Sequence, residues 1–283
     1  MKYKPFLRIA LLLSLALLQA CSSPPTSQTP ESLGIQWVWI EGGEFLMGSP
    51  ENEGQDEEHP QHRVKLSGFW MSATEVTNAQ YNRFLMAMEA KGGPDWEAVR
   101  ESGSRNPGLD DKFKGENLPV VKVSYEEALA FCEWVGHGVT LPTEAQWEYA
   151  CRAGSSRAYG MGDDGQPITD GSLSAYAWFG DGHSKGCTYP VGKNRASAFG
   201  LYDMHGNVWE WCSDWYGEDY YQKCKDRGIV TDPTGAFAGL DRVIRGGSWY
   251  AEASLCRSAF RYWDTPGYRT DDLGFRVVVP VAK

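Results

Sequence analysis

The sequence has little positive charge for its length. It contains 27 Lys and Arg residues against 37 Asp and Glu residues, which gives a net charge of −10 at pH 7. Nucleic-acid binding depends mainly on cations that neutralise phosphates. We therefore expect no nucleic-acid partner.

Histidine is also scarce. The chain has five, at positions 59, 62, 137, 183 and 205. His59 and His62 are close together, but a proline lies between them in a charged stretch, and we interpret both as solvated. No His-x-x-x-His pair or His/carboxylate triad is present, so the ligands of a catalytic zinc or non-haem iron site are missing. Ser248 lacks the Gly-x-Ser-x-Gly elbow, which argues against a hydrolase.

Long hydrophobic runs are absent apart from one, between Ile9 and Leu18. That run is too short to span a bilayer. It follows three cations at the N-terminus, which is the layout of an export signal. Residues 18–21, LQAC, resemble a bacterial lipoprotein cleavage site. We therefore predict a signal peptide at residues 1–20 and lipidation of Cys21.

The segment after Cys21 is rich in Ser and Pro, a composition typical of flexible tethers. We assign residues 21–34 to this tether and residues 35–283 to one domain, long enough to bury a core. Loss of the three signal-peptide cations would change the net charge from −10 to about −13. The anchor predicts a cell-envelope location with the membrane as a partner. Ser22, in place of an aspartate, indicates the outer membrane if the host is Gram-negative.

Six cysteines follow the lipidation site, at positions 132, 151, 187, 212, 224 and 256. Export to an oxidising compartment favours disulfides, and an even number permits up to three. Six cysteines allow fifteen connectivities, and the sequence alone does not choose among them.

Periodic patterns predict few regular elements. Short helices are expected after Thr77, Ser124 and Thr143, each of which is a good N-cap. Strand patterns are brief and lie at residues 34–40, 44–48, 62–71, 242–247 and 274–281. Between about residues 154 and 241 there is little periodicity of either kind. Such a segment in a compact domain is usually functional or held by other constraints.

Six phrases occur in an order that we recognise. They are GGEFLMGS (42–49), ATEVTNAQY (73–81), LPTEAQWEYACRAG (141–154), FGLYDMHGNVWEW (199–211), RVIRGGSW (242–249) and LGFRVV (273–278). Together they resemble the formylglycine-generating enzyme, or sulfatase-modifying factor, family over nearly all of the mature chain. The resemblance implies a compact α+β domain with little regular secondary structure, related to a C-type lectin core.

The best-known members of that family use oxygen and copper to oxidise a cysteine of a target protein to formylglycine. Their two active-site cysteines lie five positions apart after the Gly-Gly-Ser turn. The same count puts Ala251 at the first position and Cys256 at the second, so Cys256 is the candidate catalytic thiol. One thiolate cannot form the two-thiolate site that suits Cu(I). We therefore expect no copper.

The resemblance also implies a different role for Cys256. When the count starts from Thr265, the phrase CRSAFR matches a family cysteine that forms a disulfide with the cysteine of WEYACRAG. On that alignment Cys256 pairs with Cys151. A bridged cysteine would not be the catalytic thiolate.

Relatives that carry the phrase YDMHGNVWEW hold a structural calcium ion. The resemblance implies that the ligands here are the side chains of Asp203 and Glu210 and the backbone carbonyls of Gly206 and Val208. Oxygen ligands of this kind suit Ca²⁺, and burial of two acids without a cation would be costly. The alternative is that these acids cap turns or pair with arginines such as Arg245.

Two functional hypotheses follow. The first is a cell-envelope lipoprotein that uses this domain as a binding or assembly module, with an unidentified envelope protein as partner. The second is an oxidase of the formylglycine-generating type that acts on an exported protein. The alanine at position 251 and the absence of a histidine cluster favour the first.

Overall fold

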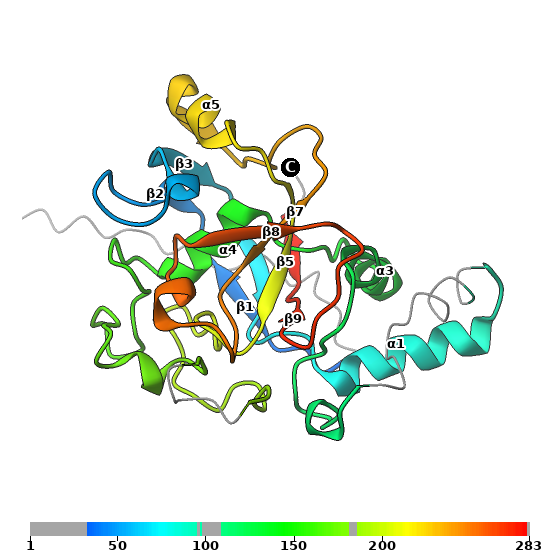
Figure 1. Ribbon diagram of the computed structural model, residues 1–283. Coiled ribbons are helices and arrows are strands. Elements are labelled where there is room, and N and C mark those ends of the chain that lie inside the picture. The colour runs from blue at the N-terminus through cyan, green and yellow to red at the C-terminus, as the bar shows by residue number, and fades with distance from the viewer. Residues whose placement is uncertain (1–32, 95–96, 98–108, 181–185, 282–283) are drawn as a thin grey trace, which may run out of the picture.

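The computed structural model describes residues 33–94, 97, 109–180 and 186–281 of the chain (Figure 1). The signal peptide predicted at residues 1–20, Cys21 and nearly all of the tether lie outside the described residues. Short helices and strands are joined by long irregular segments. This confirms the predicted α+β domain with little regular secondary structure.

The three predicted helices form as α1 (Asn78–Lys91), α3 (Tyr125–Val135) and α4 (Glu144–Arg152). Their predicted N-caps, Thr77, Ser124 and Thr143, each accept a hydrogen bond from a backbone N–H of the first turn. The side chain three residues after each cap accepts a bond from the N–H of the cap itself, which completes a capping box. Local sequence therefore determines where these helices begin.

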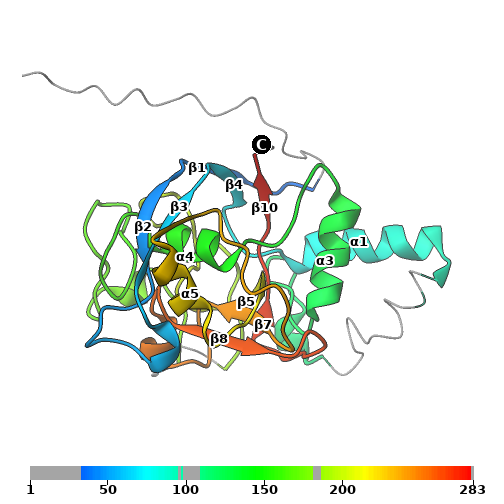
Figure 2. The same cartoon turned by 90° about the horizontal axis from the view of Figure 1, so that it is seen from above.

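The strands of the described residues form three small sheets. In spatial order, the sheets are β1 (Trp37–Ile40), β4 (Phe69–Ser72) and β10 (Val278–Pro280); β2 (Gly43–Met47), β3 (His62–Leu66) and β6 (Ile229–Thr231); and β8 (Arg261–Asp264), β7 (Arg242–Arg245), β5 (Trp209–Trp215) and β9 (Leu273–Gly274). Neighbouring strands are antiparallel, except for the parallel pairs β3–β6 and β5–β9. Figure 2 shows β1, β4 and β10 on one side of the molecule and β5, β7 and β8 on the other.

Several elements lie outside the predicted patterns: β5, α5 (Tyr220–Arg227), β6 and β8. β5 is buried along most of its length, so its sequence lacks the alternation of a half-buried strand. α5 starts after Asp219, whose side chain makes no capping hydrogen bond. The sequence of β5 therefore lacks a strand pattern, and that of α5 lacks a capping pattern.

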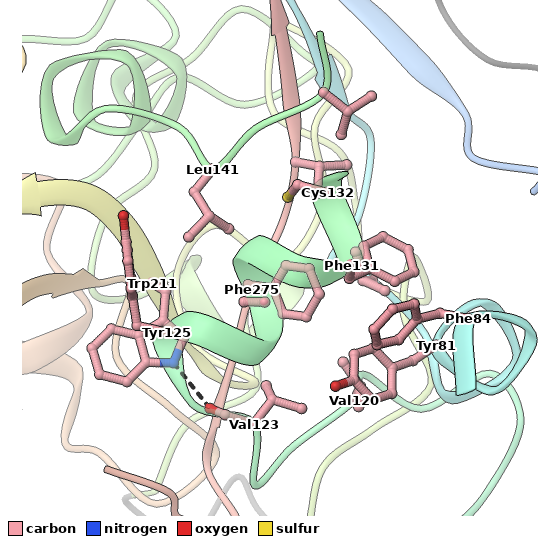
Figure 3. Packing of buried hydrophobic residues seen from close by; sticks show 14 of the residues in the cluster. Tyr81, Phe84, Val120, Val123, Tyr125, Phe131, Cys132, Leu141, Trp211 and Phe275 are labelled. Carbon is pink, nitrogen blue, oxygen red and sulfur yellow. Dashed lines mark hydrogen bonds between the residues drawn. The ribbon is translucent and has the colours of Figure 1, made fainter. Parts of the chain in front are cut away.

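One hydrophobic core lies between α1, α3 and β5 (Figure 3). The rings of Tyr81 and Phe84 on α1 pack against Phe131 on α3, with centroids 5.8 and 5.9 Å away from it. Trp211 on β5 is fully buried, and its Nε1 donates to the carbonyl oxygen of Val123 at 3.0 Å. The indole N–H is thus satisfied inside an apolar core, as burial requires.

A second core surrounds α4, which contacts β2, β3, β5 and β7. Trp147 on α4 is fully buried, and a Cβ at Gly246 would lie 3.1 Å from its ring. α4 therefore supports the turn that follows β7. No helix within the described residues combines the length and apolar character needed to cross a membrane.

Candidate functional site

The Gly-Gly-Ser turn passes directly over Cys256. After β7, Gly246 and Gly247 adopt φ values of 104° and 74°, which lie in the left-handed region. A Cβ at Gly247 would clash with the sulfur of Cys256. Glycine at this position therefore allows the backbone to lie on the thiol.

Ala251 and Cys256 are brought together by the structure. Both are buried, and both belong to one apolar cluster with Tyr159, Tyr176 and Phe179 among its members. Cys256 ends a short 3₁₀ turn, residues 253–256, that follows Ala251. The two positions that the sequence singled out thus share one buried site, which within the described residues contains a single cysteine.

His205 links the two cysteines that the resemblance paired. Its Nδ1 donates to the carbonyl oxygen of Cys256 at 2.8 Å, and its Nε2 accepts the N–H of Gly160 at 3.1 Å. The sulfur of Cys151 lies 3.7 Å from both ring nitrogens and 3.5 Å from the hydroxyl of Ser258. No local sequence pattern indicates this contact, because Cys151, His205 and Cys256 are far apart along the chain.

Burial decides the charge states at this contact. It lowers the pKa of His205 to about 4, and it raises the pKa of the Cys151 thiol to about 12. At neutral pH the imidazole is therefore neutral and Cys151 is a thiol. His205 has both nitrogens hydrogen-bonded, so it is a structural residue and not a base ready to activate a cysteine.

The predicted disulfide between Cys151 and Cys256 is not formed in the structure. No disulfide joins any of the described cysteines. The sulfur of Cys151 packs against His205 and Ser258 instead. The pairing in an oxidising compartment stays a prediction, which peptide mapping under non-reducing conditions can test.

The predicted calcium-binding loop is buried and strongly curved. Asp203, Gly206 and Asn207 have positive φ values of 58°, 121° and 65°. For the two non-glycine residues this conformation costs energy that the surroundings must offset. A Cβ at Gly206 would clash with the carbonyl group of Trp178, so only glycine fits there.

Glu210, the last predicted ligand, already has a cationic partner. Its two carboxylate oxygens accept hydrogen bonds from Nε and Nη2 of Arg276 at 2.7 and 2.8 Å. The indole N–H of Trp147 donates to it at 2.7 Å. The alternative of an arginine pair is therefore realised at Glu210, although the partner is Arg276 and not Arg245.

Glu75 is the residue that sequence reasoning missed. Its Oε1 accepts from the amide of Asn207 at 2.9 Å, while Asp203 Oδ2 accepts from the N–H of Gly192 at 2.7 Å. The remaining oxygens, Glu75 Oε2 and Asp203 Oδ1, are buried and receive no hydrogen bond from any N–H group or hydroxyl. The two carboxyl groups can hydrogen-bond to each other only when one of them carries a proton. Burial raises the pKa of Glu75 well above its ordinary value, and the charge of Asp203 adds to this effect. Burial also raises the pKa of Asp203 to about 6.

This acid pair, Glu75 and Asp203, fits a cation better than the ligand set drawn from the resemblance alone. Buried oxygens without partners are costly unless a proton or a metal ion satisfies them. No group of three or more His, Cys, Asp or Glu side chains within the described residues is arranged to hold a metal ion. A calcium ion here would therefore rely on the two carboxylates of the acid pair, together with the carbonyls of Gly206 and Val208 that the resemblance implies.

Comparison with known sequences decides the family. The profile of the sulfatase-modifying factor enzyme 1-like domain matches residues 23–281. The chain belongs to this family. It is 36% identical to the formylglycine-generating enzyme of Streptomyces coelicolor, an alignment that covers 91% of this chain and 93% of the relative.

Solved structures of similar proteins show the same family fold. PvdO from Pseudomonas aeruginosa has a TM-score of 0.69 at 28% identity, with 87% of this chain and 94% of that chain covered. Treponema denticola variable protein 1 has a TM-score of 0.67 at 25% identity, with 87% and 95% covered. The fold expected from the resemblance is therefore confirmed.

One of the two neighbouring histidines, His62, lies elsewhere in this sulfatase-modifying-factor domain than the sequence suggested. His62 on β3 is buried, not solvated as the sequence suggested, and its ring packs edge-on against Tyr221 with centroids 4.6 Å apart. Burial lowers its pKa. The charged residues around it in the sequence hid this position, because β3 alternates buried and exposed side chains.

Proposed function

We propose that this chain is a lipid-anchored protein of the cell envelope that uses its family domain to bind or assemble other components, without two-cysteine copper chemistry. The observation that carries the proposal is the buried site of Ala251 and Cys256, whose apolar cluster has one cysteine. Cu(I) is selected by soft sulfur ligands, and a single thiolate leaves it without a second one. An unidentified envelope protein is the expected partner.

A matched pair of proteins tests the absence of copper chemistry. We expect the wild type to bind no stoichiometric Cu(I) and to leave a Cys-x-Pro-x-Arg peptide unchanged in the presence of oxygen. Ala251→Cys places a second sulfur at the first thiol position, so it should gain one equivalent of Cu(I). Copper titration under anaerobic conditions and mass spectrometry of the peptide measure both results.

The opposite result would restore the alternative. Its support is the 36% identity to a formylglycine-generating enzyme across most of the chain, together with Cys256 at the second thiol position. If the wild type converts the peptide with oxygen uptake, and Cys256→Ser abolishes the conversion, the protein is an oxidase acting on a cysteine of an exported target.

Calcium belongs to the proposal as a structural ion. The acid pair supplies carboxylate oxygens that accept no hydrogen bond, and Asp203 lies in the same positive-φ loop as Gly206, whose carbonyl the resemblance implies as a ligand. Hard oxygen ligands of this kind suit Ca²⁺. The ion would compensate the buried charge of the acid pair and hold the loop in its strained conformation.

The anchor rests on the sequence at residues 18–21. We expect Cys21 to carry lipid and to hold the domain at the membrane, on the outer membrane in a Gram-negative host. Cys21→Ser should yield an unacylated protein, uncleaved or soluble. Mass spectrometry of the N-terminal peptide measures this, and acylation that persists in the variant contradicts the anchor.

A further inference from the structure

A groove of about 860 Å³ lies between α5, β6 and the segment at residues 232–238. Figure 1 shows α5 at the opposite end of the molecule from α1. We call the groove between α5, β6 and residues 232–238 the α5 groove. Its aromatic lining consists of Trp215, Tyr220 and Phe237. It shares no lining residue with the buried site of Ala251 and Cys256.

An unpaired strand edge forms one wall of the α5 groove. Within the described residues β6 pairs only with β3, and Val230 and Thr231 line the groove. The N–H of Asp232 donates to the carbonyl oxygen of Lys65, next to β3. Because successive residues of an extended chain direct their backbone groups to opposite edges, the N–H and C=O of Thr231 point away from β3. Such an edge is a template for another extended chain.

The charges that line the groove are unequally compensated. Asp219 forms an ion pair with Lys223 at 2.7 Å, and Asp232 accepts hydrogen bonds from the N–H and hydroxyl of Ser67. Arg227 and Arg242, by contrast, have no carboxylate partner among the described residues. The groove therefore presents two cations that pair with no carboxylate of the described residues, on a chain whose net charge is −10.

Arg242 is held rigidly in place. Its guanidinium carbon lies 3.4 Å from the ring centroid of Trp215 and 4.1 Å from that of Tyr125, and Nη1 donates to the carbonyl oxygen of Ser213. Its Nε is buried and has no hydrogen-bond partner. A cation fixed in this way is ordered before an anionic group arrives, which lowers the entropy cost of binding.

The rim of the groove exposes large apolar side chains. Phe237 is fully exposed, and Leu240 on the same loop is 86% exposed. Exposed apolar groups beside a groove mark interaction sites in soluble domains. Phe237 lines the groove as well, so it could cover an occupant that lies along β6.

We propose that the α5 groove binds an extended peptide segment of a partner protein that carries an acidic residue beside a large apolar one. The segment adds a strand to the free edge of β6, hydrogen-bonded to the N–H and C=O of Thr231. Its acidic side chain lies on Arg227 and Arg242, and its apolar side chain packs on Phe237 and Trp215. This is recognition by strand addition, in which the backbone gives affinity and alternate side chains give specificity.

This inference deepens the proposed function, because it rests on the domain being a binding module and names its surface. The two can fail separately. Conversion of a cysteine peptide by the wild type would overturn the proposed function without any effect on the groove. Loss of peptide binding at the groove would overturn this inference and leave the copper result unchanged.

The experiment uses the full chain in detergent and an array of hexapeptides that combine one Asp or Glu with one Leu or Phe among Val and Thr. A second array replaces the acid with Lys. We expect the acidic array to retain the protein and the Lys array to fail, since cations line the groove. Binding of the best peptide should weaken with added salt, because ionic screening acts on exposed charges.

Matched variants locate the binding. Arg227→Glu should weaken the best peptide by about tenfold, the effect of roughly 1.4 kcal/mol. Lys225→Glu makes the same charge change on α5 outside the groove lining and should leave affinity nearly unchanged. Thr231→Pro removes the N–H of the free edge and should weaken binding, whereas Thr231→Val keeps it.

Three outcomes would overturn the proposal. The first is an array without any enriched acidic sequence, or with enrichment that Arg227→Glu and Thr231→Pro leave unchanged. The second is co-sedimentation with phosphatidylglycerol vesicles that Phe237→Ser abolishes, which would assign the loop to a membrane. The third is self-association that Arg227→Glu abolishes in analytical ultracentrifugation, which would assign the groove to a second copy of the chain.

Discussion

Two sets of buried carboxylates differ in how their charge is compensated. The first set, Glu144 and Glu148 on α4, is surrounded by arginines. The second set is the acid pair, Glu75 and Asp203. All four residues are at least 98% buried. The two sets are therefore desolvated to a similar extent, and they differ in the groups that compensate their charge.

The carboxylates of α4 have all their oxygens satisfied. Glu144 accepts from Nε and Nη2 of Arg261 at 2.7 and 2.8 Å. Glu148 pairs with Arg245 and Arg152 and accepts the N–H of Gly48 at 2.9 Å. Burial by itself would raise the pKa of Glu148, but the two arginines and Gly48 hold it below its ordinary value. Glu148 is therefore ionised, and the carboxylate oxygens of both residues need no further ligand.

The acid pair has no arginine of its own. The nearby Arg276 is engaged by Glu210 through two hydrogen bonds. The pKa values of Glu75 and Asp203 are consequently raised, the opposite direction from Glu148. Buried carboxylates with arginine partners are structural, while those without partners take up a proton or a cation. By this comparison Glu144 and Glu148 have a structural role, whereas Glu75 and Asp203 form a candidate cation-binding site.

Among the variants proposed here, removal of an arginine that pairs with Glu144 and Glu148 should lower the free energy of unfolding most. Arg245→Met keeps apolar volume but leaves Glu148 with one guanidinium fewer. Loss of one partner from a buried ion pair costs about 3 to 5 kcal/mol, because the other charge stays buried. Urea denaturation at pH 7 measures this change in the free energy of unfolding.

Two further variants check the cause. Arg63→Met removes a surface pair with Glu44, whose side chains are 60% and 42% exposed, and should cost less than about 1 kcal/mol. Addition of Glu148→Gln to Arg245→Met should recover part of the loss. If it recovers nothing, the loss comes from packing and not from uncompensated charge.

Asp214 is a buried carboxylate outside the two sets, and its raised pKa predicts that the free energy of unfolding depends on pH. It lies beside Glu144, whose backbone N–H donates to it at 3.0 Å, and it forms no ion pair with any described residue. Burial raises its pKa to about 7, and the charge of Glu144 adds to the effect. The folded state then binds this proton more tightly than the unfolded chain does. Its stabilising contribution is present below about pH 4 and is lost as pH rises to about 7.

Asp214→Asn should remove that pH dependence. The wild type should lose up to about 4 kcal/mol relative to the variant between pH 4 and pH 7, since each unit of pKa corresponds to about 1.4 kcal/mol. Denaturation at several pH values measures the difference. Asp219→Asn, at an exposed ion pair, serves as the control. Parallel profiles for the wild type and Asp214→Asn would show that Asp214 keeps an ordinary pKa.

Calcium should distinguish the acid pair from the arginine-paired carboxylates. At about a hundredfold excess over Kd, an ion that binds only the folded state stabilises it by about 2.7 kcal/mol. Glu75→Gln should abolish this gain and, in chelator at neutral pH, should stabilise the protein, because the buried carboxyl group no longer has to take up a proton that the unfolded chain would release. Asp163→Asn, at an exposed acidic loop, should change neither result. Thermal melts that are identical with calcium and with chelator in the wild type would refute the site.

Much of the fold could be predicted from local sequence. The caps Thr77, Ser124 and Thr143 begin their helices as expected, since capping depends on side chains only three residues apart. β5 and β8 were missed. β5 is buried along most of its length, and a fully buried strand lacks the period of two on which strand prediction depends.

The site was predicted in part. Ala251 and Cys256 lie together as the family motif implied, and Asp203 lies in the buried loop. Glu75 was missed because its partner Asn207 lies 132 residues away, and no local pattern joins the two. The charged neighbours of His62 in the sequence indicate a solvated side chain, whereas the alternation of β3 directs it inward.

The sequence by itself determined the family, the helix starts and the presence of alanine, not cysteine, at position 251, because each depends on residue identity at a fixed spacing. Tertiary structure alone decided which charges meet. Arg276 and not Arg245 pairs with Glu210, the acid pair forms without an arginine of its own, and His205 contacts both Cys151 and Cys256. The physical reason is that electrostatic compensation in a low-dielectric interior depends on distances of a few ångströms between distant segments, which packing sets.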